Sequence, residues 1–196
     1  MRLLLASGSE TRRRMLADAG VAFEVRPAEV DEAAAKARLV AASVGGAEVA
    51  QALATLKASG LAPPETLVIG SDQVLEQDDG TILGKAGSRD EAAGQLRALA
   101  GRTHRLHSAA VLAQGGTQLW SDCETVTLRM RPLGDGFLQE YLDHEWAAIR
   151  YNVGCYRIEG RGVQLFEAIE GSYFAILGMP LIPLLAELRR RGAVSS

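Results

Sequence analysis

The sequence predicts an α/β fold in which helices flank a twisted, mixed β-sheet. Strand-like and helical patterns alternate through the first hundred residues, as is typical of α/β proteins. The alternation fails after residue 100, where strand patterns follow one another, so we expect a mixed sheet and not a purely parallel one. No linker-like stretch rich in Pro, Gly and Ser divides the 196 residues, so residues 1–196 should form one domain.

The first half of the chain supplies three strand patterns and three helical patterns. The opening apolar run is too short to cross a membrane and is better explained as a strand. The apolar run at 67–70 is typical of a central strand buried on both faces, and it leads into Ser71 and Asp72. In order we expect a strand at 3–6, a helix at 10–19 that Gly20 ends, a strand at 21–25, helices at 32–42 and 47–59, a loop at 61–64 and a strand at 67–70.

Turn and capping signals organise the second half. A hairpin turn is expected at 77–80, and a last helix begins at Pro180 with a leucine stripe behind it. Periodicity alone predicts a strand at 154–160 and a short amphipathic helix at 165–171. The other expected elements are a helix at 89–99, a strand region at 103–130 with a turn at 115–116, and a helix at 135–142.

Composition limits the classes of function. Two distant cysteines, Cys123 and Cys155, without a secretory signal indicate a reducing cytoplasm. The net charge of −3 offers no general attraction for nucleic acid or an anionic membrane, so we expect neither as a partner. Any phosphate chemistry must therefore come from a local basic site. Lysines are only three of the 21 basic residues, so each lysine is a candidate for a role that arginine could not fill.

Residues 7–14 (Ser-Gly-Ser-Glu-Thr-Arg-Arg-Arg) combine a small turn with three arginines at the start of a helix. Positive charge there opposes the helix dipole unless an anion is bound. The hydroxyls of Ser7 and Ser9 and the backbone N–H groups of the turn would form a phosphate cradle. Successive helical residues step by about 100°, so at most one or two of the arginines can face the ligand. The alternative is a solvated basic face.

Carboxylates and lysines supply the other parts of a site for phosphoryl chemistry. Asp72 follows an apolar strand, at the position where open α/β sheets bind ligands. Asp31 and Glu32 form a second acidic position, although Asp31 alone is most simply a helix N-cap. A triphosphate carries about three to four negative charges, which Mg²⁺ held by carboxylates, together with Lys57 and Lys85, would neutralise. One further carboxylate would position and deprotonate the attacking water.

At these segments the chain resembles the Maf family of nucleotide pyrophosphatases. Residues 5–12 are similar to the family signature Leu-Ala-Ser-x-Ser-Pro-Arg-Arg. The resemblance spans nearly the whole chain, and the ordered combination of blocks is specific. The later blocks are Val30-Asp31-Glu32, Ala54-Thr55-Leu56-Lys57-Ala58, Ser71-Asp72-Gln73-Val74, Leu83-Gly84-Lys85 and Leu177-Gly178-Met179-Pro180-Leu181.

The resemblance implies a Maf/ITPase-like fold with a central cleft. It also implies hydrolysis of a nucleoside triphosphate to the monophosphate and pyrophosphate, by a cytoplasmic and often homodimeric protein that needs Mg²⁺ or Mn²⁺. Asp72 would be the general base, with Lys85 as a second catalytic residue. The residues that would bind phosphate or metal are Ser7, Ser9, Arg12, Glu32 and Lys57, with Glu32 and Asp72 as the metal ligands.

Departures from the family pattern bear on which nucleobase the substrate carries. Glu10 and Thr11 replace the usual Pro-Arg, which removes one cation near the nucleotide, and Tyr151-Asn152-Val153 replaces Asp-Lys-Ala. Glu159 stands where members that cleave dTTP and UTP have Gln, so the chain is more similar to the subgroup that cleaves 7-methyl-GTP. A carboxylate accepts hydrogen bonds from guanine N1–H and N2–H₂ and favours an N7-methylated, positively charged base. The candidate selectivity residues are Thr11, Gln73 and Glu159.

Two other interpretations of function stay open. One is a pyrophosphatase for dTTP and UTP, or for other modified or deaminated triphosphates. The nucleobase that the protein prefers would distinguish it from an enzyme for 7-methyl-GTP. The other is a nucleotide-binding regulator, for example of cell division, whose site senses and does not cleave. Retention of Asp72 together with Lys57 and Lys85 argues against a sensor, because binding alone does not require a positioned base.

Overall fold

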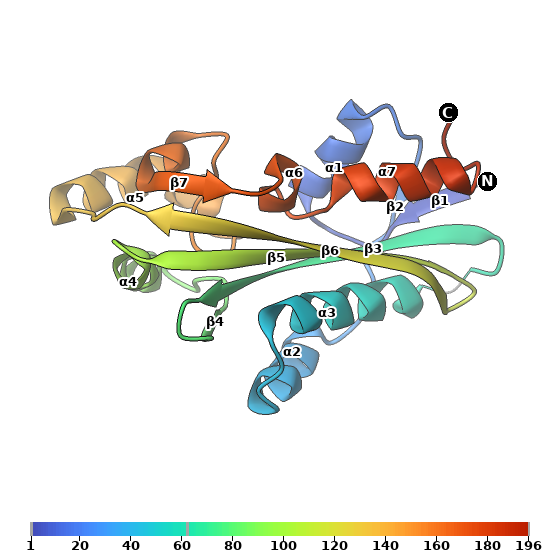
Figure 1. The fold of residues 1–196 in the computed structure, drawn as a ribbon, viewed down its shortest axis with the longest axis horizontal. Helices are drawn as coiled ribbons and strands as arrows, with labels where there is room; N and C mark the ends of the chain where they lie inside the picture. The colour runs from blue at the N-terminus through green and yellow to red at the C-terminus, as the bar shows by residue number, and fades with distance from the viewer. Residues whose placement is uncertain (1, 62, 196) are drawn as a thin grey trace. The chain divides into compact units, whose positions relative to one another are not determined.

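The structure is a computed structural model that describes residues 2–61 and 63–195 (Figure 1). In chain order the helices are α1 (Glu10–Asp18), α2 (Glu32–Ala41), α3 (Gly46–Gly60), α4 (Arg89–Leu99), α5 (Asp135–Ile149), the 3₁₀ helix η1 (Arg161–Leu165), α6 (Tyr173–Ile176) and α7 (Leu181–Arg190). The strands are β1 (Arg2–Leu5), β2 (Glu24–Val25), β3 (Thr66–Gln77), β4 (Ile82–Leu83), β5 (Thr103–Gln114), β6 (Thr117–Met130) and β7 (Phe166–Glu170).

Within the described residues, one mixed sheet has the strand order β2-β1-β3-β5-β6-β7, and β4 pairs with β3. Both strand directions occur, because β1 runs parallel to β2 and β3 whereas β4 and β7 pair antiparallel. Helices flank this sheet, which confirms the predicted α/β class. Contacts divide the chain into two compact units, one of residues 2–73, 107–125 and 172–195, the other of residues 74–106 and 126–171. That residues 1–196 act as one domain stays a prediction.

The first unit has helices on both faces of its strands. Figure 1 shows α1, α6 and α7 on one face and α2 and α3 on the other. Residues 67–71 of β3 are all buried, which confirms the prediction of a central strand covered on both sides. Leu5, Leu16 and Leu184 meet in the core beneath α1 and α7. Full burial of such a side chain contributes about 1.5–3 kcal/mol to folding.

The second unit is built around antiparallel pairing and two packed helices. β7 pairs with β6, with Leu128 opposite Ile169, and α4 packs on α5. The side chain of Ser88 accepts a hydrogen bond from the backbone of Glu91 and so begins α4 at the predicted residue. Gly80, with φ +84°, closes the predicted hairpin turn between β3 and β4.

Tertiary contacts overturn several predicted boundaries. β3 does not end before Asp72 but continues to Gln77, because Val74 and Leu75 extend its buried run. The predicted strand at 154–160 is wrong, since Gly154 and Cys155 have φ of +76° and +57°, outside the β region. The predicted helix at 165–171 is also wrong, because pairing with β6 makes Phe166–Glu170 a strand. β2 is shorter and α5 longer than expected. The predicted loop at 61–64 includes Ala62, which lies outside the described residues.

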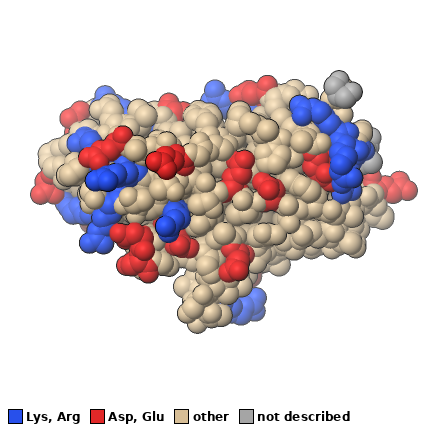
Figure 2. Space-filling view, viewed as in Figure 1, with Lys and Arg blue, Asp and Glu red and all other residues tan. Residues whose placement is uncertain are grey.

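The surface carries charges of both signs. Figure 2 shows acidic and basic side chains interspersed over the displayed face, in keeping with the small net charge of −3. In the described parts of the chain, no helix combines the length and apolar character that a membrane span requires.

Candidate active site

The start of α1 is organised by two serine hydroxyls. Ser9 is the N-cap, and its Oγ accepts from the backbone N of Arg12 at 3.4 Å. Ser7 is buried at the end of β1, and its Oγ accepts from the backbone N of Ser9 at 3.2 Å. The predicted Ser-Gly-Ser turn therefore lies between a buried strand and a helix N-terminus, where the dipole favours an anion.

Arg12 alone of the three arginines on α1 is buried. Arg13 and Arg14 are exposed and pair with acidic residues on the same helix. The Arg12 guanidinium donates from Nε to the carbonyl oxygen of Gly178 at 2.9 Å and from Nη1 to Ser7 Oγ at 3.3 Å. Of the three arginines on α1, Arg12 therefore faces the interior, and that it faces a bound phosphate stays a prediction.

Within the described residues, no carboxylate lies within ion-pair distance of Arg12. Burial lowers the pKa of its guanidinium, and the more distant charges of Asp72 and Glu32 act in the opposite direction. A buried cation without a bonded counter-ion is costly, because desolvation is not repaid by a close partner. An anion bound beside Arg12 would relieve that cost, and a phosphate suits the planar fork of a guanidinium.

Lys57 joins the two predicted metal ligands. Its Nζ lies 2.6 Å from Asp72 Oδ1 and 2.8 Å from Glu32 Oε2, and it also donates to the carbonyl oxygen of Ser71 at 3.5 Å. The side chain of Lys57 is 8% exposed and that of Asp72 13%, whereas Glu32 is 49% exposed. The structure thus brings together the ammonium group of Lys57 on α3 and the carboxylates of Glu32 on α2 and Asp72 on β3.

Gly70 determines how closely α3 approaches β3. A Cβ at Gly70 would lie 2.1 Å from the carbonyl oxygen of Ala54 and 2.6 Å from the backbone N of Ala58, both on α3. Only a glycine fits such a close approach. Lys57 lies between those two residues along α3, so the missing side chain at Gly70 lets Lys57 reach Asp72.

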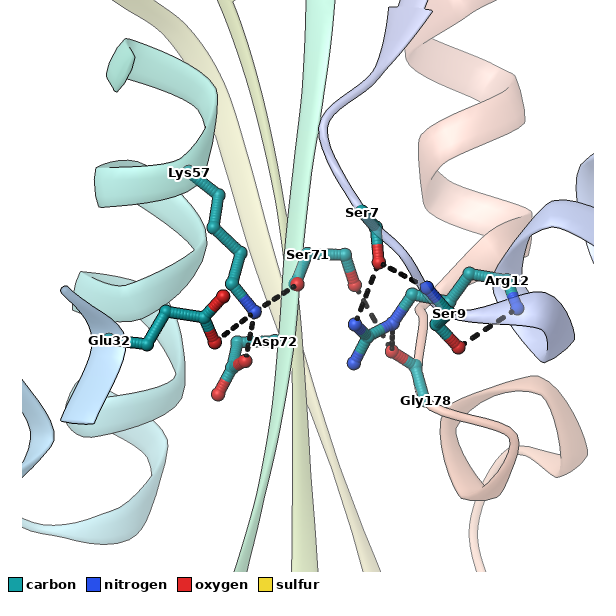
Figure 3. A network of polar contacts seen from close by, with 8 residues as sticks. All are labelled: Ser7, Ser9, Arg12, Glu32, Lys57, Ser71, Asp72 and Gly178. Carbon is teal, nitrogen blue, oxygen red and sulfur yellow. Dashed lines mark hydrogen bonds and ion pairs between the residues drawn. The ribbon is translucent and has the colours of Figure 1, made fainter. Parts of the chain in front are cut away.

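Ser71 links the acidic cluster to Arg12. Alternation along β3 turns Gly70 and Asp72 toward α3, and Ser71 toward the opposite face. The Oγ of Ser71 donates to the carbonyl oxygen of Gly178 at 3.1 Å, which also accepts from Arg12. Figure 3 shows the resulting chain of contacts, with Lys57 on one side of β3 and Arg12 on the other.

Sequence reasoning assigned no role to Ser71 or Gly178. A serine inside a buried strand and a glycine in a turn carry no chemical signal by themselves. The one available signal was their position within two of the family blocks. Gly178 has φ +106°, a backbone conformation that favours glycine.

The donor set fits a divalent cation. Glu32 and Asp72 are oxygen ligands that converge on one ammonium group, so a small cation near them would meet two carboxylates. Among the residues that the structure describes, no group of three or more His, Cys, Asp or Glu could hold a metal. Mg²⁺ is commonly bound by one or two carboxylates, with phosphate and water oxygens completing its shell.

The remaining predicted residues lie around or outside this cluster. Thr11 is half-buried on α1, and Gln73 lies on β3 with its amide bonded to α6. Lys85 and Glu159 belong to the second compact unit, and both are exposed. The backbone of Lys85 bridges to Val153. That Lys85 and Glu159 serve the same site as Asp72 stays a prediction.

The fold is α/β, and its polar cluster connects a buried arginine, through Gly178 and Ser71, to a lysine that holds two carboxylates. The chain belongs to the Maf-like protein family, which residues 2–191 match. It is 47% identical to the nucleoside triphosphate pyrophosphatase of Sphingopyxis alaskensis, over 98% of each chain. It is 47% identical to the protein of the same name in Caulobacter vibrioides, over 97% of this chain and 96% of the other. It is also 45% identical to the 7-methyl-GTP pyrophosphatase of Rhizobium etli, over 98% of each chain.

Proposed function

We propose that this protein hydrolyses a nucleoside triphosphate to the monophosphate and pyrophosphate. The observation that carries the proposal is the buried Arg12 guanidinium, which has no carboxylate partner among the described residues yet is linked through Ser71 to the Asp72 cluster. A polyphosphate would supply the missing negative charge. The names of the relatives from Sphingopyxis alaskensis and Caulobacter vibrioides agree with this activity.

In the proposed reaction, water attacks the α-phosphorus and the bond to the bridging oxygen breaks. Pyrophosphate leaves with that oxygen, and a proton of the water passes to Asp72. Lys57 holds Asp72 Oδ1 at 2.6 Å, and Oδ2 has no hydrogen bond within the described part of the chain, so Oδ2 is the oxygen that would accept the proton. Ser7, Ser9 and Arg12 would bind the polyphosphate at the start of α1.

Glu32 and Asp72 would hold Mg²⁺ or Mn²⁺. When bound, the cation neutralises charge on the phosphates. The Lys57 ammonium holds the two carboxylates together until the cation and substrate arrive. Lys85 would add a second positive charge near the polyphosphate.

We further propose a modified purine nucleotide such as 7-methyl-GTP as the substrate, with Thr11, Gln73 and Glu159 as the residues that select it. A carboxylate at Glu159 would accept from guanine N1–H and N2–H₂ and would favour a methylated, cationic base. The relative from Rhizobium etli carries the name 7-methyl-GTP pyrophosphatase. The reaction is proposed to take place in the cytoplasm, in a homodimer that size-exclusion chromatography would detect.

A nucleotide panel tests the activity and the base preference together. 7-Methyl-GTP, GTP, UTP and dTTP are each incubated with the protein and Mg²⁺ or Mn²⁺, and the products are separated by chromatography. We expect pyrophosphate in equimolar amount with the monophosphate, and the highest kcat/KM for 7-methyl-GTP. Orthophosphate as the sole product would contradict cleavage between the α and β phosphates. A preference for UTP or dTTP would overturn the proposed selection of a modified purine but not the proposed cleavage reaction.

A further inference from the structure

Residues 175–178 comprise the last two residues of the single-turn helix α6 and the turn after it, and we call them the 175–178 turn. The last residue, Gly178, offers its carbonyl oxygen to both Arg12 Nε and Ser71 Oγ, at 2.9 and 3.1 Å. The position of this oxygen therefore controls the direction of the Arg12 guanidinium. A four-residue helix has little stability of its own, so the turn must be held by side chains from elsewhere.

Gln73 holds the turn with its amide nitrogen. Nε2 lies 2.9 Å from the carbonyl oxygens of both Ala175 and Ile176 and 3.0 Å from Ser108 Oγ. Carbonyl oxygens only accept, so the atom that faces them must be the NH₂ group and not the amide oxygen. Both N–H donors of Gln73 are thus occupied by the turn and by Ser108.

Ser108 supports the same turn from β5. It is fully buried, and its Oγ donates to the carbonyl oxygen of Ala175 at 2.6 Å. Ser108 and Gln73 therefore fix one end of the turn, while Ser71 fixes the other end at Gly178.

Space around Gly178 is equally restricted. A Cβ at this position would lie 3.4 Å from Nε and Nη2 of Arg12 and 3.7 Å from Gln73 Oε1. Arg12 and the Gln73 amide oxygen therefore approach the same side of Gly178. A displacement of the turn would move the guanidinium with it.

We propose that Gln73 and Ser108 are positioning residues that hold the 175–178 turn so that the Gly178 carbonyl aims Arg12 at a bound polyphosphate. The inference rests on the proposed function. Besides the base selection proposed above, it assigns Gln73 an effect on polyphosphate binding that is transmitted through Arg12, because its amide N–H groups are already bonded within the protein. It also makes Ser108, a residue that does not touch Arg12, important for binding phosphate.

A double-mutant cycle tests this coupling. The affinity for inorganic tripolyphosphate with Mg²⁺ is measured by calorimetry for Ser108→Ala and Gln73→Met, each alone and combined with Arg12→Lys. Ser108→Ala removes two of these hydrogen bonds and Gln73→Met three, so each should weaken binding at least about fivefold in the otherwise unchanged protein. The same substitutions should have little further effect beside Arg12→Lys, because lysine lacks the guanidinium fork that the turn positions.

Ser121→Ala is the matched control, since the Ser121 hydroxyl accepts from Gln51 and Gln118 in the same unit but touches no part of the turn. It should leave tripolyphosphate affinity unchanged. Thermal melting identifies any variant that fails to fold. If either Ser108→Ala or Gln73→Met fails to fold, the double-mutant cycle is measured with the other substitution. Effects of Ser108→Ala or Gln73→Met that persist undiminished beside Arg12→Lys would overturn the proposal, as would a lack of tripolyphosphate binding by the unaltered protein.

Turnover of nucleotides is measured separately in the same variants. Coupling in the binding cycle without pyrophosphate release would leave the positioning role standing and reject the proposed reaction. Pyrophosphate release without coupling in the binding cycle would support the proposed reaction and reject the positioning role. A positioning role further predicts that KM rises more than kcat falls, because the phosphate contact is weakened while Asp72 keeps its own partner, Lys57.

Discussion

The Nε–H group of Arg12 donates to the carbonyl oxygen of Gly178 at 2.9 Å, although 166 positions separate the two residues. This bond brings the start of α1 against the turn that precedes α7, and Ser71 on β3 donates to the same oxygen. The site therefore depends on three distant segments, and its chemistry can be tested one contact at a time.

Asp72→Asn separates catalysis from binding. Asparagine keeps an oxygen that can accept from Lys57 but cannot take a proton from water, so kcat should fall about 10²–10⁴-fold while nucleotide affinity is retained. Steady-state kinetics and equilibrium binding of a nucleotide measure the two effects. The matched control is Asp31→Asn, because Asp31 caps α2 through Ala34 N at 2.9 Å and asparagine caps equally well. Unchanged turnover in Asp72→Asn would favour a nucleotide sensor.

Gly70→Ala should loosen the whole cluster. The new Cβ would meet the Ala54 carbonyl oxygen at 2.1 Å, so α3 must move away from β3, and overpacking of this kind typically costs about 1–3 kcal/mol. We expect a lower midpoint of urea unfolding and a loss of activity, since Lys57 moves with α3. Gly94→Ala on α4 is the control, because nothing lies within 4 Å of its added Cβ. That variant should be more stable by about 0.5–1 kcal/mol, and equal stability of the two variants would refute the close-approach argument.

Chelation of divalent cations should abolish turnover but leave the fold intact. Glu32 and Asp72 already share the Lys57 ammonium, so part of their negative charge is compensated without a metal. We expect EDTA to remove pyrophosphate release, excess Mg²⁺ to restore it, and the melting temperature to change by little in either case. A large fall in melting temperature with EDTA would indicate a structural metal instead.

His104 should make stability depend on pH below neutrality. Burial lowers its pKa from 6.5 to about 4, so the folded chain favours the neutral ring. The stabilisation is complete above the unfolded pKa and is lost as the pH falls from 6.5 toward 4, because the unfolded chain takes up the proton first. The shift corresponds to at most about 3 kcal/mol.

Urea unfolding at pH 7 and at pH 4.5 measures the effect of His104. His104→Gln should flatten the pH dependence, since glutamine can still bond the Tyr156 hydroxyl, which lies 2.8 Å from His104 Nε2. His144→Gln, at an exposed position on α5, should leave the dependence as it is. If His104→Gln loses as much stability between pH 7 and pH 4.5 as the unaltered protein, the buried imidazole is not the source of the pH dependence.

Sequence and structure agree where local signals dominate. The helix at 89–99 has a serine cap and an apolar stripe, and these local signals predicted it correctly. The strands on either side of residues 115–116 were also predicted correctly, because a pair of glycines marks the turn between them. The region 154–171 was predicted wrongly, because left-handed backbone at Gly154 and Cys155 and pairing with β6 override its periodicity. Local pattern cannot report a partner that lies elsewhere in the chain.

By itself the sequence determined the class of the fold, the family resemblance and which charged residues are candidates for the site, since these follow from residue type, spacing and order. Only the tertiary structure decided which of the arginines on α1 is buried and that Lys57 holds two acids. It alone brought in Ser71 and Gly178, whose contribution is one hydroxyl and one carbonyl oxygen. Those groups acquire a role only when strands and helices far apart in the chain pack closely enough for hydrogen bonds to form.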